Sequence, residues 1–248
     1  MVFPRCFRYN KGMERYLYYF LAIAVFLLSL LAQSHVQRVF QKYAQQHAQS
    51  GVPANRLAQE LLSRNGLSLP VQRVSGSLTD HYDPRSEVVG LSEAVYDSDS
   101  VSALAVAAHE IGHVLQHQED YGPMRMRSAV LPVANIGCRF GPLLVVGGLL
   151  LSLFVSRAGN IGYYIAMAGV VLYAVMLLFQ LITLPVEFNA SRRGLNMLTE
   201  GGYLTEEELP GAKKMLRAAA MTYLLAALGS LITVLRLFTI AQGARRRS

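Results

Sequence analysis

The sequence predicts a mainly α-helical integral membrane protein with about four transmembrane helices and a small soluble α+β region. Composition is the first reason. The 248 residues are 52% hydrophobic and only 16% charged, whereas soluble domains usually carry about 25% charged residues. Four long apolar stretches are the second reason, because each approaches the length that a helix needs to cross a bilayer. The third is the segment 36–139, which has soluble character and separates the first stretch from the second.

The four predicted spans cover about residues 16–33, 141–155, 161–184 and 218–241. Basic residues precede the first span as they would in a signal peptide. Its apolar run is long, however, and no convincing small-residue cleavage site follows, so an uncleaved anchor is favoured. Few residues separate the second span from the third, which predicts an antiparallel helical hairpin. We treat residues 1–248 as a single membrane domain.

Within the soluble region, helical and strand patterns alternate. Spacing of apolar residues predicts two helices, and two short β-branched runs predict strands joined by a turn-rich segment. From Ser100 the pattern is helical again. The predicted helices are Val36–Ala48 and Pro53–Asn65, and the predicted strands are Val71–Val74 and Glu87–Leu91.

Charge distribution favours a membrane rather than nucleic acid as the partner of this basic chain. The net charge is +7, but the basic residues gather at both ends and beside the apolar stretches. With both termini and the turn at 157–160 on one side, that side holds eight basic residues, whereas the short loop 185–217 holds five. The positive-inside rule therefore predicts cytoplasmic termini and a soluble region on the opposite side.

The motif with the clearest chemistry is H-E-x-x-H, formed by His109, Glu110 and His113. Residues four apart lie on one face of a helix, so two imidazoles at this spacing can bind one zinc ion. Glu110 is then placed beside the metal-bound water rather than on the metal. The flanking residues are uncharged, as expected for a buried helix. This motif predicts a zincin-like soluble region, in which a small sheet accompanies the metal-binding helix.

A hydrolytic zinc site needs a third protein ligand and one open position. His117 continues the histidine row, but it lies about 12 Å along the helix from His109, too far for one ion. Carboxylates remain. Glu119 and Asp120 follow too closely to fold back, and the run 206–208 has the pattern of a solvated helix start. Glu187 stands alone after the third span, on the predicted side of His109, although an acidic residue at a helix start also has a purely structural explanation.

Several segments together resemble the family of YugP-like membrane neutral zinc metallopeptidases. They are VSGSLTDHYDPRSEVVGLSEAVY, VAAHEIGHVLQHQEDYGPMRMRSAVLPVANIG, FQLITLPVEFNASRRGLNML and GAKKMLRAAAMTYLLAAL, within residues 33–237. The resemblance implies a bacterial multi-pass membrane peptidase with one zinc ion per chain. It also makes Glu187 the third ligand, because the family motif P-V-E-F-[DN]-A-S matches residues 185–191.

The order of elements is also similar to that of the CAAX prenyl proteases and heat-shock membrane proteases. In those enzymes an aspartate four residues after the glutamate ligand orients a histidine. Here Ser191 stands at that position, so the support of the ligands must differ and could come from Asn189 or Ser191.

These patterns together predict hydrolysis of a peptide or protein substrate, one associated with the membrane, by a zinc-activated water with Glu110 as general base. Four polar residues are candidates for stabilising the oxyanion: His81, Tyr82, Asn135 and Arg192. The strand Glu87–Leu91 could present an edge to an extended substrate.

A different class of function also fits part of the pattern. A non-catalytic membrane scaffold could carry the same zinc as a structural ion, although such a site has no use for Glu110. Four spans would also fit a transporter, but no broken-helix pair supports that interpretation.

Overall fold

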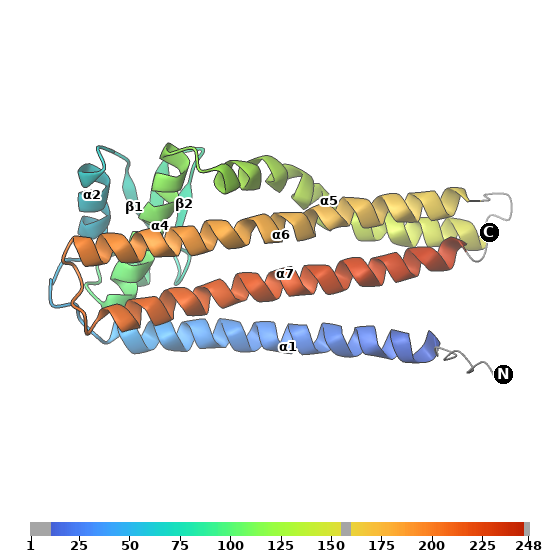
Figure 1. The fold of residues 1–248 in the computed structure, drawn as a ribbon, viewed down its shortest axis with the longest axis horizontal. Helices are drawn as coiled ribbons and strands as arrows, with labels where there is room; N and C mark the ends of the chain where they lie inside the picture. Colours follow the sequence, from blue (N-terminus) through green and yellow to red (C-terminus); the bar gives the residue numbers. More distant parts are fainter. Residues whose placement is uncertain (1–10, 155–159, 246–248) are drawn as a thin grey trace, which may run out of the picture. The chain divides into compact units, whose positions relative to one another are not determined.

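The computed structural model of the chain describes residues 11–154 and 160–245, which form long helices, short helices and a three-stranded sheet (Figure 1). The long helices are α1 (Lys11–Ala44), α5 (Gly122–Phe154), α6 (Ile161–Glu200) and α7 (Leu209–Arg245). The shorter elements are α2 (Ala54–Arg64), β1 (Val71–Val74), β2 (His81–Asp83), β3 (Val88–Ser92), α3 (Glu93–Tyr96) and α4 (Val101–Gln118).

The four long helices are each long and apolar enough to cross a membrane. As far as the structure describes them, the predicted spans therefore fall inside helices, and every one of these helices continues beyond its apolar stretch. The prediction placed residues 122–139 in the soluble region, whereas they form the first half of α5. Hydropathy marks where a helix meets lipid, not where its backbone hydrogen bonds end, and this explains the difference. Most of the predicted turn at 156–160 lies outside the described residues.

Contacts divide the chain into two compact units. The first contains the chain up to Leu30, Val133–Leu177 and the chain from Leu225 on. Here α5 and α6 approach so closely that a Cβ atom on Gly137 or Gly148 would collide with the backbone of the facing helix. Small residues at such crossings are how membrane helices pack in the absence of a hydrophobic driving force.

The second unit contains Leu31–Pro132 and Leu178–Leu224. Its sheet has the order β1-β3-β2, with β1 parallel and β2 antiparallel to β3. The predicted strand Val71–Val74 is β1, and the predicted strand Glu87–Leu91 corresponds to β3. Because β3 is the central strand and is paired on both sides, it offers no free edge to a substrate, and that part of the prediction is wrong. The segment expected to be only a turn contributes the edge strand β2.

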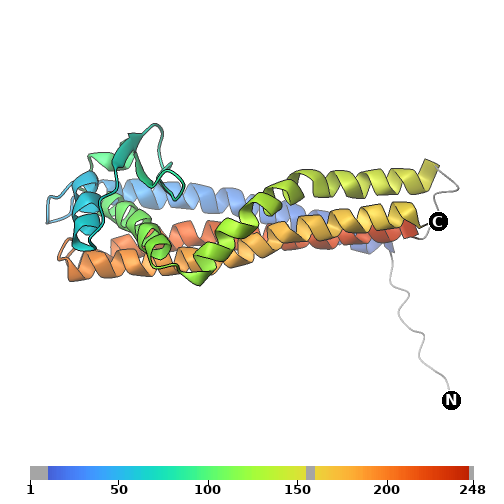
Figure 2. The ribbon, with the colours of Figure 1, turned by 90° about the horizontal axis from the view of Figure 1, so that it is seen from above.

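Helix α4 is the centre of the second unit's core. Ser100 caps it, with its Oγ accepting a hydrogen bond from the Ala103 backbone N–H at 3.3 Å. The helix contacts α2, α3, β2 and β3, and these elements lie around it in Figure 2. Most of its side chains are buried, including Leu104 and Ile111. Small residues such as Ala and Gly allow this burial without excess volume.

Two glycines bring the backbones of α4 and α6 together. A Cβ atom built on Gly112 of α4 would lie 2.5 Å from the Ala190 carbonyl oxygen of α6. Farther along the crossing, a Cβ on Gly194 of α6 would lie 3.0 Å from the Ala108 carbonyl oxygen of α4. No real Cβ atom fits at the first of these distances. Gly112 therefore allows an approach of the partner helix that any other residue would prevent, and Gly194 allows a tight contact that a Cβ atom would crowd.

We predict that Gly112→Ala separates these helices. Inserting a methyl group into a packed contact typically costs about 1–3 kcal/mol, and here the obstacle is backbone that cannot rotate away. Thermal unfolding in detergent, followed by circular dichroism, should show a lower midpoint for the variant. Gly147→Ala is the control, because nothing lies within 4 Å of its added Cβ. An unchanged midpoint for Gly112→Ala would mean that the close approach is not required.

Candidate metal centre

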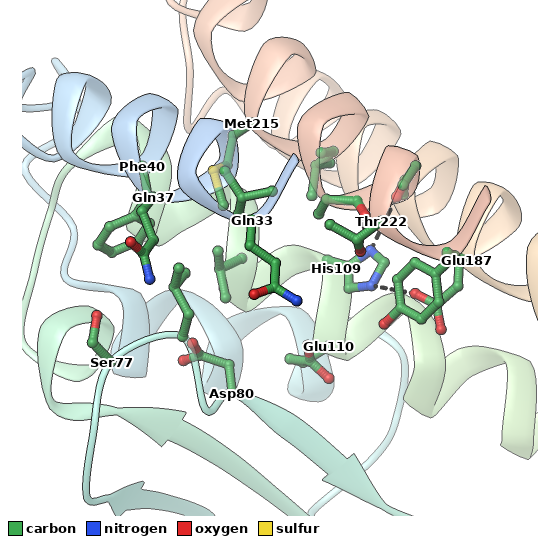
Figure 3. A pocket seen from close by; sticks show the side chains of 18 of the residues that line it. Gln33, Gln37, Phe40, Ser77, Asp80, His109, Glu110, Glu187, Met215 and Thr222 are labelled. Atoms are coloured by element: carbon green, nitrogen blue, oxygen red, sulfur yellow. Dashed lines mark hydrogen bonds and ion pairs between the residues drawn. The ribbon is translucent and has the colours of Figure 1, made fainter. Parts of the chain in front are cut away.

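Three predicted side chains from two helices meet in one place. His109 and His113 come from α4 and Glu187 from α6, and one potential ligand atom from each lies within 4.8 Å of the others. Glu187 Oε2 is 3.3 Å from His109 Nε2 and 3.6 Å from His113 Nε2. The dashed line from His109 to Glu187 in Figure 3 marks the first of these contacts. The Glu187 side chain is only 3% exposed, so this carboxylate is shielded from water.

A chain of hydrogen bonds fixes the tautomer of His113. Gln116 Nε2 donates both of its hydrogens, one to the Val186 carbonyl at 2.8 Å and one to Asn189 Oδ1 at 3.0 Å. Its Oε1 faces His113 Nδ1 at 3.0 Å. Because Oε1 can only accept, Nδ1 must carry the proton. In neutral His113, Nε2 then presents a lone pair toward Glu187.

The orientation of Asn189 is itself fixed from the surface. Arg193 Nε donates to Asn189 Oδ1 at 2.8 Å. The two terminal nitrogens of Arg193 donate to the two carboxylate oxygens of Glu119, each at 2.7 Å. This bidentate pair lowers the pKa of Glu119 through the hydrogen bonds from Arg193. A planar fork of this kind holds the guanidinium in one orientation. The amide of Asn189 therefore cannot flip without losing a charged donor.

His109 is held by a different residue. Ser191 Oγ lies 3.1 Å from His109 Nδ1 and can accept its proton. Both residues named from the sequence thus support the candidate ligands, but each supports a different histidine: Ser191 contacts His109 directly, and Asn189 reaches His113 through Gln116. Gln116 was not predicted. It lies three residues after His113, on the same helical face, and this spacing was the available signal.

The donor set fits a zinc ion. When both histidines are neutral with their Nδ1 protons toward Ser191 and Gln116, two imidazole lone pairs and a carboxylate face one another with no hydrogen between them. Such an arrangement is repulsive unless a cation lies inside it. Tetrahedral zinc with bonds of about 2.0–2.1 Å separates neighbouring ligand atoms by about 3.3–3.4 Å. The distances from Glu187 Oε2 to the two histidine nitrogens, 3.3 Å and 3.6 Å, are close to this spacing.

Glu110 lies in the same cavity as the candidate ligands. This cavity has a volume of about 820 Å³, and Glu110, His109 and Glu187 are among its lining residues. Figure 3 shows the Glu110 side chain apart from the His109–Glu187 contact. Burial raises the pKa of Glu110 to about 7, and the negative charge of Glu187 contributes in the same direction. A carboxyl group with such a pKa can both accept and release a proton near neutral pH.

Two further polar groups reach Glu187. Arg127 Nη1 of α5 lies 3.7 Å from Glu187 Oε1. Tyr223 of α7 interacts with the same carboxylate and also lines the cavity. Sequence reasoning missed both. Tyr223 follows the start of an apolar stretch, where a tyrosine has many other roles, and Arg127 is one of several basic residues near a span end.

The oxyanion candidates chosen from the sequence lie elsewhere, and the described lining of the 820 Å³ cavity includes none of them. His81 Nδ1 contacts the Thr79 carbonyl oxygen at 2.9 Å, and the Tyr82 hydroxyl contacts His117 at 3.0 Å. Arg192 lines a second cavity between α6 and α7. Asn135 is exposed on α5.

Three of the rejected ligand candidates, His117, Glu119 and Glu208, have other partners. His117 contacts Tyr82, and Glu119 forms the ion pair with Arg193. The run 206–208 is only partly solvated, which corrects the prediction. Glu208 is 8% exposed and accepts hydrogen bonds from the backbone N–H groups of Gln49 and Thr205. A threonine followed three residues later by glutamate is the pattern of a capping box at a helix start.

Comparison with known proteins points to the same metal. A family model described as "Putative neutral zinc metallopeptidase" matches residues 18–242. A protein of Bacillus subtilis (strain 168) named "Putative membrane protease YugP" is 45% identical over 230 residues, covering 92% of this chain and 98% of the relative. No solved structure matches the chain. With a family model covering nearly the whole chain and a relative this similar, the protein belongs to the neutral zinc metallopeptidase family that the model describes.

Proposed function

We propose that this multi-pass membrane protein is a zinc-dependent endopeptidase, with His109, His113 and Glu187 as the metal ligands and Glu110 as the general base. The observation that carries the proposal is the convergence of two imidazole nitrogens and one carboxylate oxygen at zinc-like spacing. The family membership supports the same metal. A zincin-like arrangement of the soluble unit stays a prediction alongside this function.

Each residue then has a defined task. Bound zinc supplies Lewis acidity, which lowers the pKa of water toward about 7 and polarises a carbonyl group. Glu110 accepts a proton from the attacking water and delivers it to the departing amine. Its raised pKa suits both halves of this transfer. Ser191 and Gln116 keep the Nδ1 protons of the histidines turned away from the metal position.

We assign stabilisation of the carbonyl oxygen to Tyr223, with the positively charged Arg127 as a second donor. Both reach Glu187 and therefore lie beside the metal position. Tyr223 is the stronger candidate, because it lines the cavity that also contains Glu110. A phenol donates one hydrogen bond without adding a charge, and preorganised donors of this kind act on charge that develops in the transition state.

The substrate we propose is a membrane protein or a protein segment close to the membrane, since the ligand-bearing helix α6 is also a candidate span. The charge count on the two sides further suggests cytoplasmic termini with the zinc site on the opposite side. A non-catalytic scaffold with structural zinc is the rival. Structural zinc sites are closed by four protein ligands, whereas three candidate ligands converge among the described residues and a large cavity adjoins them.

Zinc content is the first test. Detergent-purified wild type should carry about one zinc ion per chain by mass spectrometry of the metal, as a single site requires. Glu187→Ala and His113→Ala should both lose it, because each leaves only two ligands. Glu200→Ala is the matched control, since this carboxylate lies on the same helix as Glu187 but is exposed and is not part of the site. Retention of zinc in Glu187→Ala, with binding as tight as in wild type, would place the third ligand elsewhere.

Glu110→Gln separates metal binding from catalysis. The amide keeps the shape of the side chain but cannot accept the proton, so we expect zinc content to be unchanged and kcat to fall by about 10²–10⁴-fold. Cleavage of an unstructured membrane-tethered protein, followed by gel and mass spectrometry, provides the measurement. If the variant instead retains zinc and the protein's full biological activity, that result would contradict the peptidase proposal and support the non-catalytic scaffold.

Tyr223→Phe tests the proposed oxyanion donor. Removing one hydroxyl should leave zinc content unaltered and lower kcat by about 10²-fold with a small change in KM. Tyr203→Phe is the control, because its hydroxyl donates to Glu60 at 2.7 Å and is not part of the cavity lining described above. Equal activity of Tyr223→Phe and wild type would contradict the assignment and direct attention to Arg127.

A further inference from the structure

The cavity that contains Glu110 extends along helix α1. One wall is formed by Gln33, Gln37 and Gln41 of α1, and the facing wall includes Ser77 and Asp80 of the segment between β1 and β2. Figure 3 shows Gln33 and Gln37 extending from α1 into the pocket, toward the side on which Asp80 and Glu110 lie. All of these residues belong to the second unit. The groove is therefore built within a single compact part of the chain.

The three glutamines form a row with a regular spacing. They are four residues apart on a helix, which places them on one face with a rise of about 6 Å between neighbours. In an extended peptide, groups on the same side repeat about every 6.6–6.8 Å. The two repeats are similar enough for successive side-chain amides to meet successive peptide groups of a bound strand.

These amides are available for a ligand. All three glutamines are exposed, and none of their side chains makes a hydrogen bond within residues 11–154 and 160–245. Each primary amide offers two hydrogens and a carbonyl oxygen. A main-chain peptide group offers the complementary N–H and C=O. A glutamine side chain can therefore form a hydrogen bond with the N–H or the C=O of a bound main chain, whatever side chains the substrate carries.

The row also has a defined relation to the membrane-crossing part of its own helix. The apolar run of α1 ends at Ala32, and Gln33 follows it directly. A polypeptide that leaves the bilayer beside α1 would meet Gln33 first and Gln41 last. The distance between those positions along the helix is about 12 Å, which corresponds to about four residues of extended chain.

We infer that this groove binds the juxtamembrane segment of a membrane-anchored protein, in extended form and through its main chain, with Gln33, Gln37 and Gln41 as the contacts. The inference rests on the proposed peptidase function and names the substrate class for the same site. Charge does not select the substrate along this wall, because amides are neutral. On the facing wall, Asp80 already accepts hydrogen bonds from the Ser92 backbone N–H at 2.7 Å and its hydroxyl at 2.9 Å.

What selects a substrate in this arrangement is backbone access and position. A folded segment hides its N–H and C=O groups in its own hydrogen bonds, so it cannot pair with the row. An unfolded segment far from the bilayer gains nothing from the membrane anchor. Tethering raises the effective concentration of the segment at the groove. The best substrate is therefore an unstructured stretch that begins close to the end of a transmembrane helix.

The test uses full-length protein in liposomes with a model substrate, a single-span protein carrying an unstructured extension of about 40 residues. Gln37→Met keeps side-chain length and removes the hydrogen-bonding groups. We expect KM, expressed as mole fraction in lipid, to rise about threefold to tenfold with kcat nearly constant, as the loss of a hydrogen bond made equally in ground and transition states requires. The control is Gln45→Met, because Gln45 is also exposed but is not part of the cavity lining.

Binding is measured separately, by energy transfer between labelled substrate and labelled Glu110→Gln protein in the same liposomes. Each substitution is combined with Glu110→Gln in one chain. Binding that is weakened by Gln37→Met but not by Gln45→Met supports the groove, even if the wild type never cleaves the substrate. In that case only the peptidase proposal fails. If the wild type cleaves the substrate and the Gln37→Met variant cleaves it with the same KM, the proposed binding groove is wrong but the proposed peptidase function is not. Absence of both binding and cleavage overturns both.

The position of the cut tests the relation to the membrane. Inserting ten unstructured residues directly after the substrate's span should leave the cut at the same distance from the span, so that it moves to a different sequence. A soluble version of the extension should be cleaved at least tenfold more slowly at equal concentration. A cut that stays with its sequence, or a soluble peptide cleaved as fast as the tethered one, overturns the juxtamembrane assignment.

Discussion

The contact between the backbones of α4 and α6 is the constraint on which the candidate site depends. Two histidines on one helix can present their nitrogens to a metal, but they cannot complete its coordination. A third ligand must come from another element, and the candidate Glu187 reaches the histidines because Gly112 and Gly194 allow the helices to touch. The same crossing brings Ser191 to His109. The packing at these two glycines thus determines how the side chains of the candidate site lie relative to one another.

A line of hydrogen bonds connects this interior arrangement to the protein surface. It begins at the ion pair of Glu119 and Arg193 and continues through Asn189 and Gln116 to His113. Each member has a role that its neighbour dictates, because a guanidinium only donates and an amide oxygen only accepts. The Nδ1 side of the imidazole at the end is therefore oriented by a neutral amide rather than by a carboxylate. An exposed ion pair contributes little to stability in general, but here its value is the orientation it imposes.

The sequence predicted the local parts of this structure better than the assembled ones. The spacing of His109 and His113 has a direct geometric meaning on a helix, and apolar stretches have one in a bilayer. The strand Val71–Val74 was also identified from its residues. The pairing of β3 on both sides was not, because sheet order depends on contacts between distant segments. The edge predicted there was wrong for that reason.

The residues that support the candidate ligands show the same difference between local and assembled structure. The motif at 185–191 indicated that Asn189 or Ser191 would hold the ligands, but choosing between them required the rotation of α6 against α4. The link from Asn189 through Gln116 to His113 could be recognised only once that rotation was known. Tyr223 and Arg127 lie on other helices, and nothing in the sequences of those helices indicated that these two side chains would contact Glu187. Side chains brought together by tertiary packing leave no periodic trace in the chain.

The division of the candidate ligands between α4 and α6 has a consequence for biosynthesis. A growing chain that has produced α4 already contains both histidines and Glu110, yet it lacks the carboxylate that completes the donor set. That carboxylate appears only after α5 and most of α6 have been made, and it reaches the histidines only when the two helices have docked. The candidate metal centre therefore cannot form until most of α6 has been made. Under the proposed function, a shorter nascent chain has no peptidase centre.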